Sequence, residues 1–338
     1  MIVFCHLLND NSGSPIVLRE AIRALTDAGE EAVLFVGSQG RGALETAGVP
    51  IHRYWYRRSR YRLLTLLTYA TSQVLLYRAL SRARLSADAV VYVNTLLPFG
   101  AALWARRHGR PILYHIHEVS ISPRPLQRFL VAMVEKTAGR AIFVSEDNCA
   151  RLPVAKVPTA VVPNPIAPHI AERAFVTPYT PRRTGRFVAL MLASPRDFKG
   201  VPEFLGLASR LAGCKDVHFA LVLNGDTTEV AQYLAKYRLP GNVEIQPRTN
   251  TPEDFYAEAD VLLNLSRVDQ WIETFGLTII EAMAFGLPVI VPPVGGPTEL
   301  VDEGKEGFLV DSRDATALEQ RIRTLANSPE QAMAMSKA

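Results

Sequence analysis

The sequence contains little cysteine. Its three cysteines, Cys5, Cys149 and Cys214, are spread over 338 residues. Three is an odd number and the spacing matches no metal-ligand pattern, so a disulfide framework is excluded and a reducing cytoplasm is the expected environment. Met1 is followed directly by an apolar, strand-like run, so we expect no signal peptide.

The sequence also lacks a long hydrophobic run. Its most apolar segment, residues 63–77, is interrupted by threonine, serine and glutamine. A helix that spans a bilayer needs about 20 predominantly apolar residues, so this segment is too short and too polar. The composition, 48% hydrophobic and 21% charged, is typical of a globular protein, and the length allows two domains.

Acidic residues are absent from residues 46–87, whereas residues 53–84 hold eight arginines interleaved with tyrosines and one tryptophan. Arginines attract anionic headgroups and aromatic rings sit at headgroup level, so this segment favours peripheral contact with an anionic membrane. An ordinary amphipathic helix with an exposed basic edge is the alternative. No recognised nucleic-acid-binding module accompanies the charge, so we expect no nucleic acid partner.

Charge divides the chain into two halves. Residues 1–165 carry 20 basic against 11 acidic residues, a net +9, and residues 166–338 carry 17 against 22, a net −5. Strand-like and helix-like segments alternate in both halves, which predicts doubly wound α/β domains. We expect domains at 1–165 and 187–338, joined by a linker at 166–186 that is rich in proline, arginine and threonine.

One glycine-rich pattern and one acidic pattern resemble cofactor and metal motifs without matching them. Gly37, Gly40 and Gly42 have the spacing Gly-x-x-Gly-x-Gly and follow the second strand, whereas a dinucleotide fingerprint needs Gly-x-Gly-x-x-Gly after the first. Glu258 and Asp260 resemble an Asp-x-Asp metal signature only loosely and lead into a buried strand. We therefore expect neither an NAD site nor a metal requirement.

The most informative segment begins at Glu273. A helix is predicted to start near Gly276 and to stop at Gly286, with Glu281 two turns inside it. The N–H groups of a helix N-terminus attract phosphate, and the two flanking carboxylates are suited to accept hydrogen bonds from hydroxyls. A ligand with a diphosphate between two hydroxyl-bearing ends, such as a nucleotide-sugar, would match this pattern.

The same residues carry a family resemblance, because Glu273-x7-Glu281 encloses Phe275-Gly276 and continues as Glu281-Ala282-Met283-Ala284-x-Gly286-x-Pro288-Val289. This pattern resembles the donor-site signature of the retaining GT-B glycosyltransferases of family 4, also called group 1. The resemblance implies an α/β GT-B fold, with two Rossmann-like domains facing an interdomain cleft. The first domain would bind the acceptor, and the second a UDP- or GDP-sugar used as substrate, with no cofactor.

The resemblance also implies roles for individual residues. Arg196 and Lys199 lie in a strand–helix turn, where two cations would offset the charge of the diphosphate. His117 follows a strand at the ligand-bearing edge of an open sheet and would lie close to the transferred sugar. The implied catalytic residues are His117, Glu273, Lys199 and Arg196. The implied donor-binding residues are Gly13, Arg196, Lys199, Arg248, Glu273, Phe275, Gly276, Leu277, Thr278 and Glu281.

The implied activity is retaining, metal-independent transfer of a sugar to a lipid-linked or polysaccharide acceptor, in the synthesis of a bacterial lipopolysaccharide, capsule or exopolysaccharide. The expected location is the cytoplasm, peripherally on the inner face of the plasma membrane. A nucleotide-sugar epimerase or hydrolase and a non-catalytic GT-B-like binding protein remain as alternatives. Members of this family usually end in a helix that crosses back to the first domain; here the chain stops at Ala338, so we expect a truncated or reduced crossover.

Overall fold

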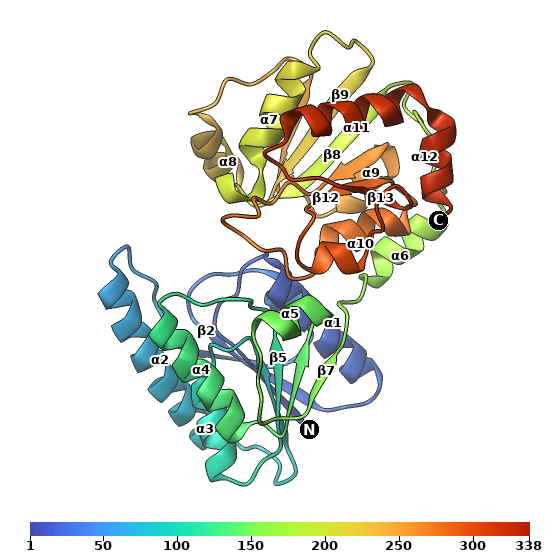
Figure 1. Cartoon of the computed structure of the whole chain (residues 1–338). Coiled ribbons are helices and arrows are strands. Elements are labelled where there is room, and N and C mark those ends of the chain that lie inside the picture. The colour runs from blue at the N-terminus through green and yellow to red at the C-terminus, as the bar shows by residue number, and fades with distance from the viewer. The chain divides into compact units, whose positions relative to one another are not determined.

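The computed structural model describes all residues, 1–338, and the chain divides into two compact units (Figure 1). Unit 1 is Met1–Pro165 and unit 2 is Ile166–Ala338. Each unit contains one parallel sheet with helices on both faces, as predicted for doubly wound α/β domains. None of the helices combines the length and the apolar character that crossing a bilayer requires.

Unit 1 is built on a seven-stranded sheet in the order β3-β2-β1-β4-β5-β6-β7. The strands are β1 (Ile2–His6), β2 (Ala32–Gly37), β3 (Ile51–Tyr54), β4 (Val90–Asn94), β5 (Ile112–Ile116), β6 (Arg140–Phe143) and β7 (Thr159–Val161). The helices are α1 (Gly13–Asp27), the 3-10 turn η1 (Ala43–Thr46), α2 (Arg62–Arg82), α3 (Phe99–Arg107), α4 (Arg124–Thr137) and α5 (Glu146–Arg151).

The two faces of this sheet bury separate hydrophobic clusters, because successive side chains of a strand point to opposite faces. In β1, Val3 packs with α2, α3 and α4, whereas its neighbour Phe4 packs with α1 and η1. Both side chains are fully buried, and β1 pairs in register with β2 and β4 on either side. The near-continuous apolar sequence of β1 follows from this burial on both faces.

Unit 2 is built on a six-stranded sheet in the order β10-β9-β8-β11-β12-β13. The strands are β8 (Phe187–Ala193), β9 (Val217–Leu223), β10 (Val243–Pro247), β11 (Val261–Leu263), β12 (Val289–Val291) and β13 (Gly307–Leu309). The helices and 3-10 turns are α6 (Pro168–Phe175), η2 (Asp197–Lys199), α7 (Val201–Arg210), α8 (Thr227–Leu234), α9 (Pro252–Glu258), α10 (Leu277–Ala284), η3 (Gly296–Glu299), α11 (Ala315–Asn327) and α12 (Pro329–Ser336).

Helices α7, α8, α11 and α12 cover one face of this sheet, and α6, α9 and α10 cover the other. The segment 166–186, expected as a linker, contains α6 and belongs to unit 2. Ile170 and Ala174, four positions apart on one face of α6, are buried against that second face. Tyr179 donates a hydrogen bond to the carbonyl of Asp260, and the backbone N–H of Arg182 bonds the Asp260 carboxylate.

Each sheet has one point where its winding reverses. In unit 1, β1 and β4 are neighbours, with the later strands of each half leading away in opposite directions. In unit 2, the corresponding neighbours are β8 and β11. In open α/β sheets, ligands bind outside the carboxyl ends of the strands at this switch point. The topology therefore marks one candidate ligand edge in each unit.

Gly200 allows two loops at the edge of the unit 2 sheet to pack closely against each other. It follows η2 with φ +84, and a Cβ at this position would lie 2.0 Å from the carbonyl oxygen of Leu265, which follows β11. The backbone after β8 thus approaches the backbone after β11 more closely than a side chain allows. The close approach brings the loops that carry Lys199 and Glu273 side by side.

We expect Gly200→Ala to lower the free energy of unfolding by at least about 1–2 kcal/mol, because it combines a left-handed backbone with a clash. Gly206→Ala is the matched control. Gly206 lies exposed in the middle of α7 with open space around its Cα, so alanine should raise the free energy of unfolding by about 0.5–1 kcal/mol. Denaturant titration of both variants measures these changes; a Gly200→Ala variant as stable as the wild type contradicts the packing.

Candidate functional site

The centre of the unit 2 edge is an ion pair between two predicted site residues. Lys199 ends η2 and Glu273 lies in the loop before α10; Lys199 Nζ is 2.7 Å from Glu273 Oε2, and the side chains are only 20% and 15% exposed. Ser266 donates to the same oxygen over 3.2 Å. Lys199 Nζ also lies 4.6 Å from the ring centroid of Trp271, a favourable cation–π position.

The ion pair keeps both charges present without a net charge. Burial by itself would raise the pKa of Glu273, but the charge of Lys199 and the hydrogen bonds from Lys199 and Ser266 lower it below its ordinary value. Glu273 is therefore ionised at neutral pH and neutralises the lysine. An anionic ligand that reaches Lys199 must compete with this carboxylate.

The turn that carries Lys199 is itself anchored. Asp197 Oδ1 accepts hydrogen bonds from the hydroxyls of Tyr233 and Tyr237 at 2.8 and 2.7 Å, and Lys236 bonds both carboxylate oxygens. Burial opposes ionisation of Asp197, but these hydrogen bonds outweigh it and lower its pKa to about 2. Asp197 thus stays charged and ties η2 to the region of α8.

The loop before α10 is held by a second close approach. The N–H of Gly296 donates to the carbonyl of Glu273 over 2.9 Å, and a Cβ on Gly296 would lie 2.3 Å from the carbonyl oxygen of Thr274. Gly276 then precedes the first residue of α10, Leu277. The positive end of this helix, with the backbone N–H groups near Gly276–Thr278, therefore begins three residues after Glu273.

Glu281 lies one turn further into α10 and is only partly exposed. Its Oε2 accepts a hydrogen bond from the Tyr256 hydroxyl over 2.7 Å. Burial raises the pKa of Glu281 to about 7, although the Tyr256 bond opposes the shift. Near neutral pH this carboxyl is therefore close to half protonated, unlike Glu273.

The remaining predicted residues of unit 2 differ in exposure and position. Phe275 is buried, and Leu277 and Thr278 are partly exposed in the first turn of α10. Arg196 is exposed at the start of η2. Arg248 follows β10, two strands from β8, and its Nε donates to Asn224 Oδ1 over 2.7 Å. The structure thus brings Lys199 and Glu273 together and leaves Arg248 at a distance along the edge.

At the unit 1 edge, His6, Asn94, His117 and Glu118 form a connected group, which we call the histidine cluster. His117 Nε2 is 3.0 Å from Asn94 Oδ1, so this nitrogen carries the proton and donates. Asn94 Nδ2 lies 3.1 Å from His6 Nδ1 and donates to the carbonyl of Ser14 over 3.2 Å. Because Ser14 is next to Gly13, Asn94 also positions the start of α1.

The histidines of this cluster are uncharged at neutral pH, and so is His115, whose ring centroid lies 4.0 Å from that of His117. Burial lowers the pKa of His6 to about 4 and that of His115 to about 4. Burial, and then the neighbouring histidines, hold the pKa of His117 well below its ordinary value. His117 can therefore donate and accept hydrogen bonds but does not supply a positive charge.

Glu118 orients the strand end that carries His117. Its carboxylate accepts from the backbone N–H of Leu96 at 3.0 Å and from that of His117 at 3.2 Å. Burial raises its pKa to about 7, and these backbone hydrogen bonds limit the shift. The loop after β4 and the loop after β5 are thus joined through one side chain.

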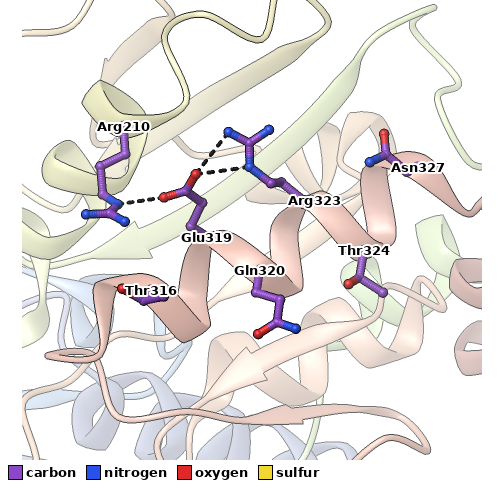
Figure 2. Close-up of a pocket in the computed structure, with 7 residues that line it drawn as sticks. All are labelled: Arg210, Thr316, Glu319, Gln320, Arg323, Thr324 and Asn327. Atoms are coloured by element: carbon purple, nitrogen blue, oxygen red, sulfur yellow. Dashed lines mark hydrogen bonds and ion pairs between the residues drawn. The ribbon is translucent and has the colours of Figure 1, made fainter.

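A surface hollow of about 510 Å³ lies elsewhere on unit 2, beside α7 and α11. Figure 2 shows that Glu319 lies between Arg210 and Arg323 there, and the ion pairs measure 2.7 and 2.9 Å. No predicted site residue lines the hollow, and its carboxylate is already paired with both guanidinium groups. We therefore assign it no part in the site.

The sequence reasoning missed several residues that the structure adds to the site. Asn94 is the last residue of β4 and His6 is the last residue of β1. Polar residues at the ends of two apolar strand-like runs were therefore a signal that the sequence offered. Tyr256 gives no such signal, because its contact with Glu281 joins residues of two helices that are 25 positions apart in sequence.

Two family models match the chain. The model described as "Glycosyl transferases group 1" matches residues 177–338, and that described as "Glycosyltransferase Family 4" matches residues 11–169. Together they leave only short segments of the chain unmatched.

Curated relatives match over shorter segments. A D-inositol 3-phosphate glycosyltransferase of Catenulispora acidiphila is 31% identical over 115 residues, which is 33% of this chain and 27% of that protein. A sucrose synthase of Acidithiobacillus caldus is 48% identical over 50 residues, 15% of this chain and 6% of that protein. The chain thus spans less than a third of the length of these relatives.

Solved structures match over nearly the whole chain. The Anabaena protein HepE, in complex with UDP and glucose, has a TM-score of 0.73 at 21% identity and covers 99% of this chain and 92% of its own. A sucrose-phosphate synthase of Thermosynechococcus elongatus has a TM-score of 0.74 at 19% identity, covering 100% and 92%. At these identities the likeness concerns the fold, which is the two-domain α/β GT-B fold. With both halves matched by their family models, the chain belongs to the glycosyltransferases of group 1 and family 4.

Proposed function

We propose that this protein transfers a sugar, with retention and without a metal ion, from a nucleotide diphosphate sugar such as a UDP- or GDP-sugar. Unit 2 would bind the donor and unit 1 the acceptor. The observation that carries the proposal is the Lys199–Glu273 pair at the switch point of unit 2, directly before the N-terminus of α10. A cation, hydroxyl acceptors and helix N–H groups are the groups that a nucleotide-sugar requires.

Lys199 and Arg196 would neutralise the diphosphate as it departs, together with the N–H groups near Gly276–Thr278. This is electrostatic stabilisation of a charge that develops in the transition state. Glu273 would then exchange part of its bonding from Lys199 to the sugar hydroxyls and fix the sugar's orientation. Glu281 would accept hydrogen bonds from the ribose hydroxyls, with Phe275 and Leu277 supporting the loop and Arg248 beside the base.

His117, which is neutral, would contact the sugar near the reacting carbon, and Gly13 would allow close approach of the donor. In the proposed front-face step, the acceptor oxygen bonds to the anomeric carbon and the bond from that carbon to the phosphate oxygen breaks. The acceptor's proton passes to the departing phosphate, so no enzyme nucleophile is needed.

We propose a lipid-linked or polysaccharide acceptor in bacterial surface glycan synthesis, on the cytoplasmic side of the membrane. The relatives named above are called a sucrose synthase and a D-inositol 3-phosphate glycosyltransferase, whereas the basic character of residues 53–84 favours a different acceptor. An epimerase or hydrolase would process the donor with no acceptor present, and a non-catalytic protein would not turn it over.

Lys199→Ala should reduce sugar transfer by about 10²–10³-fold, the usual loss when one group that stabilises developing charge is removed. Lys215→Ala, which removes an exposed lysine of the same unit, is the control and should keep wild-type activity. Product formation from UDP- and GDP-sugars measures both, with circular dichroism to verify folding. Wild-type turnover by a folded Lys199→Ala variant would refute the diphosphate assignment.

Nucleotide affinity should depend on pH through Glu281. The ionised carboxylate accepts hydroxyl hydrogen bonds, and its pKa is about 7, so binding below pH 7 must first release a proton. The affinity should therefore fall as pH decreases, approaching about tenfold per unit. Calorimetric titration of UDP and GDP across pH 5.5 to 8 tests this (a range of roughly one to two units around the pKa). The phosphates of the nucleotide titrate in the same way with the wild type and with the Glu281→Gln variant. The variant should therefore lose only the part of the pH dependence that Glu281 causes. If the affinity of the variant changes with pH as that of the wild type does, Glu281 has no part in the site.

Asn94 should act through His117. Asn94→Ala frees the His117 ring from its 3.0 Å hydrogen bond, so we expect a lower kcat with little change in the KM for the donor. A double-mutant cycle with His117→Ala should be strongly non-additive, because the second change removes what the first one misplaces. His108→Ala is the control, because His108 is an exposed histidine at the C-terminal end of α3, outside the histidine cluster. Additive losses would show that Asn94 acts independently.

A further inference from the structure

Trp271 lies beside the Lys199–Glu273 pair, and its side chain is exposed. Its ring stacks on that of Phe198, with the ring centroids 5.2 Å apart and the ring planes inclined by 22°. Lys199 Nζ lies 4.6 Å from the centroid of the same indole ring. Trp271 therefore contacts two successive residues of η2, although it belongs to the loop between β11 and α10.

Hydrogen bonds and an ion pair fix the backbone of this loop. The N–H of Arg267 donates to the carbonyl of Phe198 over 2.8 Å, and the N–H of Trp271 donates to the carbonyl of Arg267 over the same distance. The Arg267 side chain forms a largely buried ion pair of 2.8 Å with Glu203, which lies in the first turn of α7. The ring of Trp271 is thus held at a defined place relative to η2, as a group that orients a neighbour must be.

The indole ring and the Glu273 carboxylate hold Lys199 in different ways. The ammonium group of a lysine has three donors and no acceptor, and one of those donors bonds Glu273 Oε2 over 2.7 Å. The face of the indole ring attracts the ammonium through its quadrupole but carries no net charge. Glu273 therefore neutralises Lys199 while holding it, whereas Trp271 leaves the positive charge available to an anion.

We propose that Trp271 is a positioning residue, which keeps the Lys199 ammonium in place for the donor diphosphate while Glu273 exchanges part of its bonding to the sugar hydroxyls. This inference rests on the proposed function and deepens it. Without the ring, the flexible lysine side chain would adopt further rotamers, and only the fraction of molecules with the ammonium at the site would bind phosphate. The contact with the ring would persist in the complex, because it leaves donors of the ammonium free for phosphate oxygens.

The test compares two substitutions of Trp271. Trp271→Leu keeps an apolar side chain but removes the ring, and it should weaken the binding of UDP and GDP by about fivefold to thirtyfold, the range of a partly desolvated cation–π contact. Trp271→Phe keeps an aromatic face and should recover most of this loss. Uridine and guanosine lack the phosphates and should bind both variants as they bind the wild type. Calorimetric titration, by competition for the weak ligands, measures all four affinities.

Trp55→Leu is the matched control, because Trp55 of unit 1 is 46% exposed and Trp271 is 43% exposed. It should bind UDP and GDP like the wild type. In a Lys199→Met background, Trp271→Leu should cause no further loss of affinity for UDP or GDP, since the group that the ring positions is gone. Equal losses for the diphosphates and the nucleosides would show a merely structural role, and tighter diphosphate binding by Trp271→Leu would show that the ring competes with the ligand; either result overturns the proposal.

A second measurement needs no ligand and separates this inference from the proposed function. Denaturant titration of Lys199→Met, Trp271→Leu and the double variant should show a coupling of about fivefold in the unfolding constant. Additive effects would overturn the inference. If the residues are coupled but the wild type binds UDP and GDP no better than nucleosides, the proposed donor function fails and the positioning of Lys199 by Trp271 stands. If the wild type prefers the diphosphates and Trp271→Leu keeps that preference in full, the inference fails and the proposed function stands.

Discussion

The reversal of winding in each sheet is the constraint on which the rest of the structure depends. Where the connections leave two neighbouring strands in opposite directions, no helix covers their carboxyl ends, and side chains there face an open edge. In unit 1 these strands are β1 and β4, which end in His6 and Asn94. In unit 2 they are β8 and β11, whose following loops carry Lys199 and Glu273.

The two edges have different electrostatic character. In unit 2 the charged groups form an ion pair, because a largely buried lysine such as Lys199 requires a partner of opposite charge such as Glu273. Unit 1 keeps its polar groups neutral, because burial lowers the pKa of His6 and His117 and no carboxylate bonds their rings.

The exposed face of α2 in unit 1 is not determined by the packing of the core. Only one face of α2 is needed to close the hydrophobic core over β1 and β4, so the other face is unconstrained by folding. Its exposed leucines Leu63 and Leu67 lie outside the hydrophobic core of unit 1.

The sequence by itself determined the α/β class, the two-domain division of charge, the GT-B family signature and the candidate site residues Lys199 and Glu273. These depend on local periodicity, on helix-terminal residues and on a motif within some twenty-five residues, all of which can be read along the chain. Composition alone did not predict the helix in the segment 166–186, because this segment is rich in proline and arginine. Helix α6 forms there with two residues buried against the rest of unit 2.

Only the tertiary structure decided how these groups behave. His6 and Asn94 meet across 88 positions of sequence, and Gly200 acquires its role only because Leu265 lies against it. Glu273 and Glu281 look alike in the sequence, yet Lys199 lowers the pKa of the first while burial raises that of the second to about 7. Hydrogen-bond partners and desolvation are properties of folded neighbours, so no local pattern could distinguish the two carboxylates.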